Sequence, residues 1–195
     1  MSSKQQILAN IRKHRPASSP LPDLNEAWIE YEDREAQFWE TLKFVGGQGQ
    51  SLDDRSQLEA AVRQLPCFPD ARQIVCRVAG LSLGNVDVDS IDDPHDLASV
   101  DLAILPGEFA VAENGAVWVT ERTVRHRAIY FLTQHLVLVA PRDQLLDNLH
   151  QAYERLRFGE PGYGLFISGP SKTADIEQSL VIGAHGPRSL NVFLV

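Results

Sequence analysis

Short apolar runs in the second half of the chain constrain its fold more than any other feature. Each run follows the pattern that is typical of a strand, and a helical pattern over residues 143–156 comes after them. Because tight turns separate the central runs, we expect a mixed arrangement rather than a regular alternation of strands and helices. The predicted strands cover residues 101–105, 109–112, 116–120, 129–132 and 135–140.

The first half of the chain predicts an N-terminal arm in front of a globular domain. A serine-capped helix with Ile7, Leu8 and Ile11 on one side is followed by a proline-rich stretch, so residues 1–26 are interpreted as a helical arm and a linker. Residues 27–195 are predicted to form a single α/β domain. Further helices are expected over 32–44 and after Asp53 or Asp54, and strands near 50–52 and 73–78.

Composition narrows the classes of function. The chain of 195 residues has a formal net charge of −8 and a pI near 5.2, which argues against a nucleic-acid-binding surface. No apolar run reaches the length of a membrane helix and no signal-peptide core is present, so we expect a cytoplasmic protein without a membrane span. Cys67 and Cys76 have no second pair and cannot supply a four-thiolate zinc or iron–sulfur site, and no metal site is predicted.

The most informative motif lies near the C-terminus. A short strand over 164–167 leads into the turn Gly169-Pro170, and a helix is predicted to begin directly after that turn, with Ile176, Leu180 and Ile182 facing inward. The first N–H groups of a helix attract anions, and hydroxyls and a lysine surround this point. The motif therefore predicts an anion site, although the same residues could simply cap the helix. Its predicted ligand-binding residues are Ser168, Gly169, Ser171, Lys172, Thr173, Asp175, His185 and Arg188.

The segment from Ser168 to Arg188 reads SGPSKTADIEQ and then GAHGPR before a final apolar strand. It resembles the C-terminal signature of the LUD domain family, in particular its short form, the LutC/YkgG-type lactate utilisation proteins. The resemblance implies a three-layer α/β domain with a mainly parallel central sheet, similar to the isomerase and CoA-transferase (NagB/RpiA-like) group. It also implies a cluster-free accessory subunit in the oxidation of L-lactate to pyruvate, with iron–sulfur proteins as partners. No intrinsic cofactor is expected, and the ligand would be a small anion such as phosphate, a carboxylate or a CoA-like molecule.

A second motif, Glu113-Asn114-Gly115, lies between two predicted strands. Asn-Gly is a strong signal for a hairpin with a type I′ turn, so the motif could be a turn and nothing else. The resemblance adds another interpretation, because transferases of the related group carry a catalytic glutamate in a Ser-Glu-Asn-Gly element, where this chain has Ala112 for serine. Glu113 would then be the nucleophile of an acyl- or CoA-transferase or of a ligase-like enzyme, with Asn114 and Gly115 binding the ligand. Whether the protein is an enzyme stays open.

Arg127 belongs to the densest basic run of the chain, residues 122–127. The family often has an arginine at this place, so we predict that Arg127 binds an anionic substrate or an acidic partner, and the alternative is a solvated side chain at a strand end. Ligand loops of parallel α/β sheets gather at the carboxyl ends of the strands. We therefore expect Glu113 and the C-terminal turn to converge at that edge.

Overall fold

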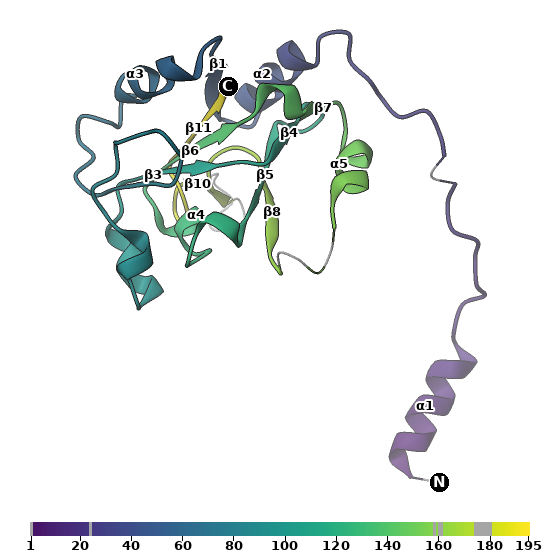
Figure 1. Cartoon of the computed structure of the whole chain (residues 1–195). Coiled ribbons are helices and arrows are strands. Elements are labelled where there is room, and N and C mark those ends of the chain that lie inside the picture. The colour runs from purple at the N-terminus through teal and green to yellow at the C-terminus, as the bar shows by residue number, and fades with distance from the viewer. Residues whose placement is uncertain (1, 24, 158, 160–161, 174–180) are drawn as a thin grey trace.

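A parallel five-stranded sheet forms the centre of the fold (Figure 1). The computed structural model of the protein describes residues 2–23, 25–157, 159, 162–173 and 181–195. The strand order is β1-β11-β6-β3-β2, and all neighbouring strands run parallel. The predicted α/β class with a mainly parallel central sheet is therefore confirmed. The strands are β1 (Gln48–Ser51), β2 (Ile74–Cys76), β3 (Leu102–Pro106), β6 (His135–Ala140) and β11 (Ser189–Leu194).

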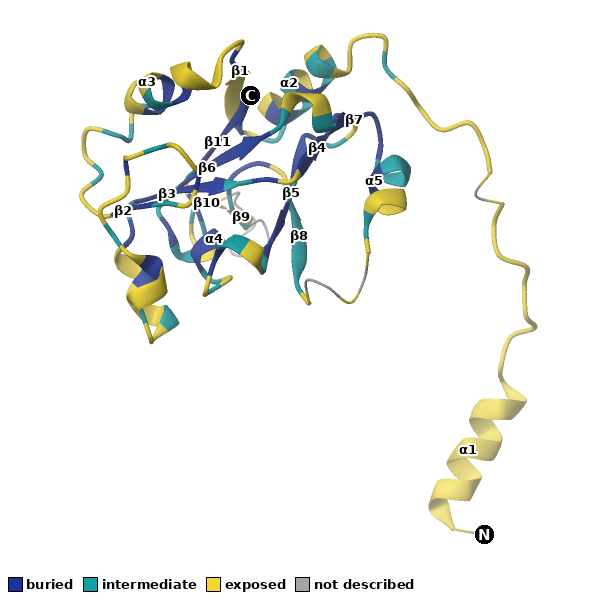
Figure 2. Ribbon diagram, in the orientation of Figure 1, coloured by how far each residue is buried: buried dark blue, intermediate teal, exposed yellow. Residues whose placement is uncertain are grey.

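Both faces of this sheet are buried, which explains the nearly continuous apolar sequence of its inner strands (Figure 2). Ile104, Val137 and Phe193 belong to the apolar cluster on one face, together with Val62 of helix α3 (Leu58–Arg63). Helix α3 follows a short 3₁₀ turn that a carboxylate caps, as the sequence predicts for this point.

A second, four-stranded sheet covers the opposite face of the parallel sheet. In its order β7-β4-β5-β8, strand β5 runs antiparallel to both neighbours, whereas β4 and β7 are parallel. Ala110 and Val117 of this sheet share one apolar core with Leu105 and Leu138 of the parallel sheet. The predicted mixed arrangement is therefore present here. The strands are β4 (Phe109–Val111), β5 (Ala116–Thr120), β7 (Leu145–Leu146) and β8 (Gly164–Ile167).

Three helices complete the globular part (Figure 1). Phe38 of α2 and Tyr130 of α4 are buried in the core between the two sheets. Ala152 of α5 packs on the outer face of the second sheet, in a cluster with Phe109 and Val111. The helix predicted over 32–44 is confirmed as α2. The helices are α2 (Arg34–Phe44), α4 (Ile129–Leu132) and α5 (Leu149–Arg155).

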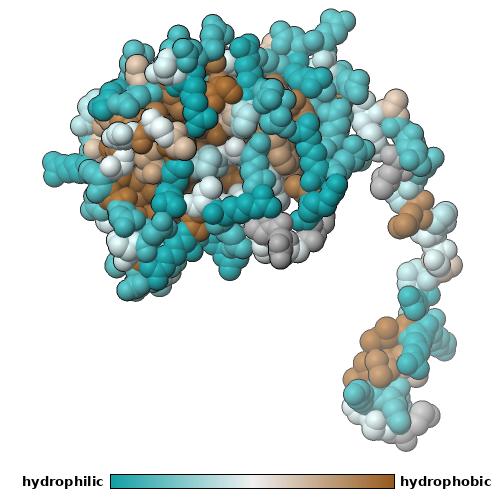
Figure 3. Space-filling view, in the orientation of Figure 1, coloured by the Kyte–Doolittle hydropathy of each residue, from teal (hydrophilic) through white to brown (hydrophobic). Residues whose placement is uncertain are grey.

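Helix α1 (Ser3–Lys13) stands apart from the globular part and is joined to it by extended chain (Figure 1). A capping box begins it, because the Ser2 hydroxyl accepts a hydrogen bond from the Gln5 amide at 3.4 Å and the Gln5 side chain accepts one from the Ser2 amide at 3.0 Å. No residue of α1 is buried, and Figure 3 shows apolar side chains exposed on it. Among the described residues, every helix is too short or too polar to cross a bilayer.

Two predicted elements in the second half are wrong. Residues 129–132 form helix α4 and not a strand, because Ile129 and Tyr130 are held in the core by a helical turn in which the Leu132 amide donates to the Ala128 carbonyl at 2.9 Å. The helix predicted over 143–156 begins only at Leu149. Before it, β7 pairs with β4, so backbone pairing overrides the helical pattern there.

The helix predicted after Gly169-Pro170 is also wrong at its start. Residues Lys172–Thr173 form strand β9, which pairs antiparallel with β10 (Val181–Ile182). β-Branched residues occupy three of the four positions and favour the extended form. Ile182, which was expected to face inward, is exposed. The predicted positions Asp175, Ile176 and Leu180 lie outside the described residues.

Candidate functional site

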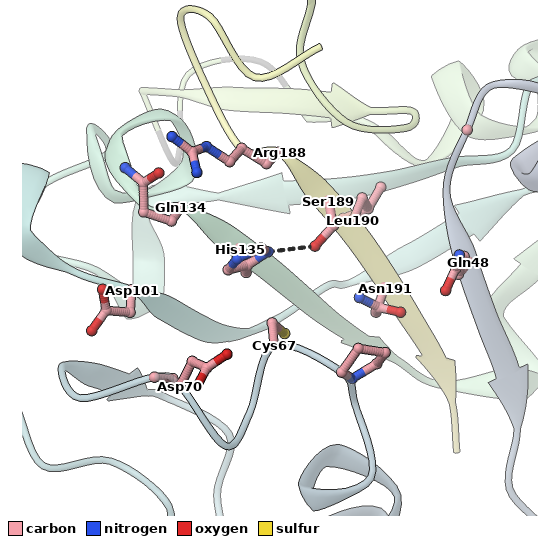
Figure 4. A pocket seen from close by; sticks show the side chains of 13 residues that line it. Gln48, Cys67, Asp70, Asp101, Gln134, His135, Arg188, Ser189, Leu190 and Asn191 are labelled. Atoms are coloured by element: carbon pink, nitrogen blue, oxygen red, sulfur yellow. Dashed lines mark hydrogen bonds between the residues drawn. The ribbon is translucent and has the colours of Figure 1, made fainter.

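A cleft of about 600 Å³ opens at the edge of the parallel sheet where its strands begin (Figure 4). His135 and Ser189 are the first residues of β6 and β11, and they are paired in register. Gln48, the first residue of β1, is paired with Asn191 in the same way. Parallel pairing therefore brings polar residues from distant parts of the sequence to one edge. This edge is the amino edge of the sheet, whereas the sequence predicts a ligand at the carboxyl edge.

His135 lies at the centre of the cleft in Figure 4. Its Nδ1 is 2.8 Å from the Ser189 hydroxyl oxygen, and the dashed line in the figure marks this hydrogen bond. Burial lowers the pKa of His135, the neighbouring Arg188 lowers it further, and Asp101 opposes this change. The imidazole is therefore neutral at pH 7 and can either donate or accept a hydrogen bond.

Arg188 and Gln134 lie together on one side of the cleft (Figure 4). The Arg188 amide donates to the Gln134 carbonyl at 2.8 Å, which fixes the two backbones next to each other. The Arg188 side chain is exposed, and within the described part of the chain it makes no ion pair. A guanidinium in this position can bind a carboxylate through two parallel hydrogen bonds.

Away from Arg188, the cleft is lined by two carboxylates and an amide. Asp101 Oδ2 accepts hydrogen bonds from the Arg72 and Gln73 amides at 2.8 and 2.9 Å, so the backbone occupies this oxygen. Asp70 is exposed, and the amide of the largely buried Asn191 lies across the cleft from it (Figure 4). The arrangement offers a cation at one end and hydrogen-bonding oxygens at the other. Such a gradient suits a small molecule with a carboxylate and a hydroxyl or carbonyl group.

Cys67 also lines this cleft. Burial raises the pKa of its thiol, so the group is protonated at neutral pH and is a poor nucleophile. Both cysteines are free thiols. Cys67 is therefore better suited to shape the cleft than to react with a ligand.

The predicted turns at Glu113 and Ser168 do meet. The Ser168 hydroxyl donates to the Asn114 carbonyl at 2.6 Å, and the Lys172 ammonium donates to the Val45 carbonyl at the end of α2. A Cβ at Gly115, whose φ is +62°, would lie 2.7 Å from the Leu42 nitrogen. Backbone carbonyls thus accept one hydrogen bond each from the hydroxyl and the ammonium that were expected to bind an anion.

Glu113 is placed at the start of helix α5. Its Oε2 accepts a hydrogen bond from the Leu149 amide at 2.8 Å, while Asn148 caps the helix by accepting from the Gln151 amide at 2.9 Å. Glu113 does not line the amino-edge cleft. The predicted hairpin between β4 and β5 is confirmed, but residues 112–115 form a four-residue connection, so a two-residue type I′ turn is wrong.

The other predicted residues are divided among different places. His185 lies beside a smaller, mainly apolar pocket of about 280 Å³, which Ser168, Gly169 and Ser171 also line. Arg127 lies elsewhere, with its guanidinium 4.9 Å from the centre of the Tyr163 ring. Among the predicted residues that the structure describes, only Arg188 lines the amino-edge cleft.

The cleft residues that sequence reasoning missed are His135, Gln134, Ser189, Asn191, Gln48 and Asp101. The sequence contains a partial signal for these residues. Asp101, His135 and Ser189 are polar residues, and each begins an apolar run that is a predicted or an observed strand. The strand order that brings these residues together cannot be read from the sequence.

A comparison with known families decides the family. The LUD domain profile matches residues 70–195. This chain belongs to the LUD domain family. The matched segment contains His135 and Arg188, whereas Gln48 and Cys67 come to the cleft from outside it.

Several curated relatives are similar to this LUD domain. Lactate utilization protein C of Geobacillus thermodenitrificans is 33% identical over 123 residues, which cover 60% of this chain and 49% of the relative. The protein of the same name from Shouchella clausii is 36% identical over 92 residues, or 45% of this chain and 40% of the relative. The chain thus spans about half the length of the curated relatives that it matches.

A solved structure supports the fold. A DUF162 family protein of Deinococcus radiodurans superposes with a TM-score of 0.64 at 18% identity, covering 83% of this chain and 96% of that protein. At this identity the likeness concerns the fold alone.

Proposed function

We propose that this LUD domain binds a small organic acid in its amino-edge cleft and acts in lactate utilisation. The names of its curated relatives support the process. The observation that carries the ligand class is the convergence of Arg188, Gln134 and the His135–Ser189 pair from separate strands and loops on one open volume.

The expected pose follows from the charges in the cleft. The carboxylate of the acid lies against Arg188, within reach of the His135 imidazole. The hydroxyl or keto oxygen then points toward Asn191, where an amide can donate or accept. L-Lactate and pyruvate both satisfy this pattern, and they differ mainly at that oxygen.

The redox chemistry is assigned to partner proteins. Oxidation of lactate to pyruvate releases two electrons, and an iron–sulfur cluster needs a thiolate set that two cysteines cannot supply. We therefore assign this chain the role of an accessory subunit that holds the acid or its product and docks on cluster-bearing proteins. Co-purification of this chain with iron-containing proteins from lactate-grown cells is the expected result.

Calorimetric titration with L-lactate, pyruvate, phosphate and CoA tests the ligand class. Arg188→Ala should weaken lactate binding at least about tenfold, since a charge-assisted hydrogen bond to a ligand contributes about 1.5–3 kcal/mol. Arg63→Ala is the matched control, because Arg63 is exposed and does not line the cleft, and its guanidinium contacts Glu59 at 2.9 Å and the Phe68 ring at 5.5 Å. Equal lactate affinities of the wild type and both variants would refute the cleft as the binding site.

The alternative of acyl or CoA transfer through Glu113 has its own test. The protein is incubated with acyl-CoA, treated with borohydride and analysed by peptide mass spectrometry. The proposal predicts an unmodified Glu113, because its carboxylate is held by the Leu149 amide. A reduced or acylated Glu113 would favour the enzyme.

A further inference from the structure

Helix α1 is short enough to need a packing partner. It has 11 residues, and isolated helices shorter than about 12–15 residues are only marginally stable in water. None of its residues is buried, and it stands apart from the globular part (Figures 1 and 2). In proteins, most of the stability of a helix comes from packing of its apolar face. We therefore expect another surface to cover the apolar face of α1.

The apolar face of α1 is accompanied by positive charge. Ile7, Leu8 and Ile11 are exposed, and they share one side of the helix because Ile11 follows the other two by four and three positions. Residues 2–22 contain four basic and no acidic residues, so they carry a formal charge of +4, and with −8 for the whole chain the remaining residues carry −12. The globular part thus has the charge that complements the arm.

An apolar groove lies open between helix α2 and strand β1 of the globular part. It has a volume of about 460 Å³, with Trp39 and Leu42 on the helix side and Gly47 and Gly49 on the strand side. A Cβ at Gly49 would lie 2.8 Å from a ring carbon of Trp39, so the glycine lets the indole lie against the strand. Phe44, the last residue of α2, is 88% exposed, the largest exposed fraction among the large apolar side chains described in the globular part. Amphipathic helices bind in apolar grooves of this kind.

The edge of the parallel sheet beside this groove is also open. The first three residues of β1 are exposed, and no described residue hydrogen-bonds to the strand on the side away from β11. The opposite edge strand, β2, is covered: the Ile74 amide donates to the Asn85 side chain at 2.7 Å, and the Ile74 carbonyl accepts from the Asn85 amide at 2.9 Å. The fold therefore protects one edge of this sheet and leaves the other uncovered.

The linker leads α1 away from the groove of its own copy. The Tyr31 amide donates to the Asp147 carboxylate at 3.0 Å, and the Asn148 side chain donates to the Ile29 carbonyl at 2.7 Å. These contacts fix the end of the linker beside the start of α5. From there the chain runs outward on the side of the domain away from β1 (Figure 1).

We propose that two copies of this chain associate by exchanging their arms, so that α1 of each copy packs into the α2–β1 groove of the other. Ile7, Leu8 and Ile11 then lie against Trp39 and Phe44 of the second copy. Each copy gives one helix and receives one, which is the reciprocal contact of a two-fold symmetric dimer. The basic arm and the acidic domain attract each other in both contacts.

Analytical ultracentrifugation of the full chain over a range of concentrations tests this association. The expected result is a reversible equilibrium between one and two chains. Added salt should shift it toward single chains, because salt screens the attraction between oppositely charged surfaces. A chain that is still monomeric at millimolar concentration would overturn the proposal.

Two variants test the two surfaces. The arm variant carries Ile7→Ser and Ile11→Ser, and the groove variant carries Phe44→Ser; all three side chains are exposed, so the fold does not depend on them. Each variant should weaken the dimer at least about tenfold, because apolar contacts are lost. Leu21→Ser is the matched control, since Leu21 is equally apolar and exposed but lies in the linker outside α1. An unchanged dimer affinity in either variant, or an equal loss in the control, would contradict the proposal.

A mixture of the two variants separates arm exchange from docking of α1 on its own copy. A mixed dimer contains one contact in which both surfaces are intact, between the arm of the groove variant and the groove of the arm variant. Native mass spectrometry of the mixture should therefore show more mixed dimer than either homodimer. If the mixture contains no more dimer than the separate variants, α1 does not bind a second copy in this way and the proposal is wrong.

Discussion

The amino-edge cleft and the Glu113–Ser168 turn contain the same types of polar side chain but use them differently. At the turn, Glu113 accepts from the Leu149 amide, and the Ser168 hydroxyl donates to the Asn114 carbonyl. These contacts join the turns to neighbouring loops, and the pocket that Ser168 lines there is smaller and mainly apolar, about 280 Å³. In the cleft, by contrast, Arg188 and the His135–Ser189 pair face an open volume of about 600 Å³. Polar residues mark a binding site when they converge on a cavity, and not merely when they cluster in sequence.

The glycines of the two turns are also explained by contacts within the protein. Gly169 has a φ of +77°, and a Cβ there would lie 2.4 Å from the Val45 carbonyl oxygen. Gly115 also approaches α2, where a Cβ would lie 2.7 Å from the Leu42 nitrogen. The glycines of both motifs therefore have a structural reason, which is the close approach of the two turns to the end of α2. Their presence needs no ligand to explain it.

A substitution at the turn should have the largest effect, and this effect is on the free energy of unfolding of the protein. Gly115→Ala forces a Cβ to within 2.7 Å of the Leu42 backbone nitrogen at a φ of +62°. Strain and overpacking together should lower the free energy of unfolding by about 2–4 kcal/mol. Urea denaturation measures this change, and lactate affinity of the folded protein should not alter.

Gly80→Ala is the matched control, because Gly80 also has a positive φ, +84°, but no heavy atom lies within 4 Å of the added Cβ. It should cost only the backbone strain, about 1 kcal/mol. If both substitutions cost the same, the close contact between the turn and α2 is not important for stability.

An intermediate effect is expected on the pH dependence of the free energy of unfolding, through His135 in the cleft. Since burial and Arg188 lower the pKa of His135 in the folded state, the unfolded state binds its proton first as pH falls. The contribution of His135 to stability should therefore decline from about pH 6.5 down to the folded-state pKa, and it should be flat above this window. The difference in unfolding free energy between the wild type and His135→Gln, measured across pH, reports this decline.

Lactate should act on the same group in the opposite direction. A bound carboxylate favours the protonated imidazole, so lactate should raise the His135 pKa and bind more tightly at acidic pH. A titration of the His135 ring by NMR with and without lactate checks this. A pKa that lactate leaves unchanged would place the ligand away from His135.

The smallest effect is expected at Lys172. Its ammonium donates to the Val45 carbonyl on the protein surface, so Lys172→Ala should cost about 1 kcal/mol of stability or less. Because Lys172 begins strand β9 and not a helix, free helix N–H groups are not the source of anion binding at residues 172–173. Calorimetry should give lactate and phosphate affinities within about threefold of the wild type. A tenfold loss would restore the turn as an anion site.

Local patterns predicted much of the fold. The apolar runs predicted strands β3, β4, β5 and β6, and the spacing of the aromatic residues within 32–44 predicted helix α2. The failures lie where tertiary contacts decide. Residues 129–132 are apolar enough for a strand, yet a helical turn buries Ile129 and Tyr130 in the core between the two sheets. Leu145 fits a helical face but pairs with Ala110 instead.

The site was less predictable than the fold. Arg188 was found because the family signature contains it, whereas His135 and Asn191 carry no motif. Their relation depends on the register of β6, β11 and β1, which joins residues that are more than fifty positions apart. A single sequence does not specify that register.

A crystal structure of the full chain with L-lactate would show directly where the ligand binds. We predict that the lactate carboxylate lies against the Arg188 guanidinium and within hydrogen-bond reach of His135 or Gln134, at the amino edge of the parallel sheet. Lactate bound instead at Ser171 to Thr173, or beside the Glu113 carboxylate, would contradict the account and return the function to the two turns.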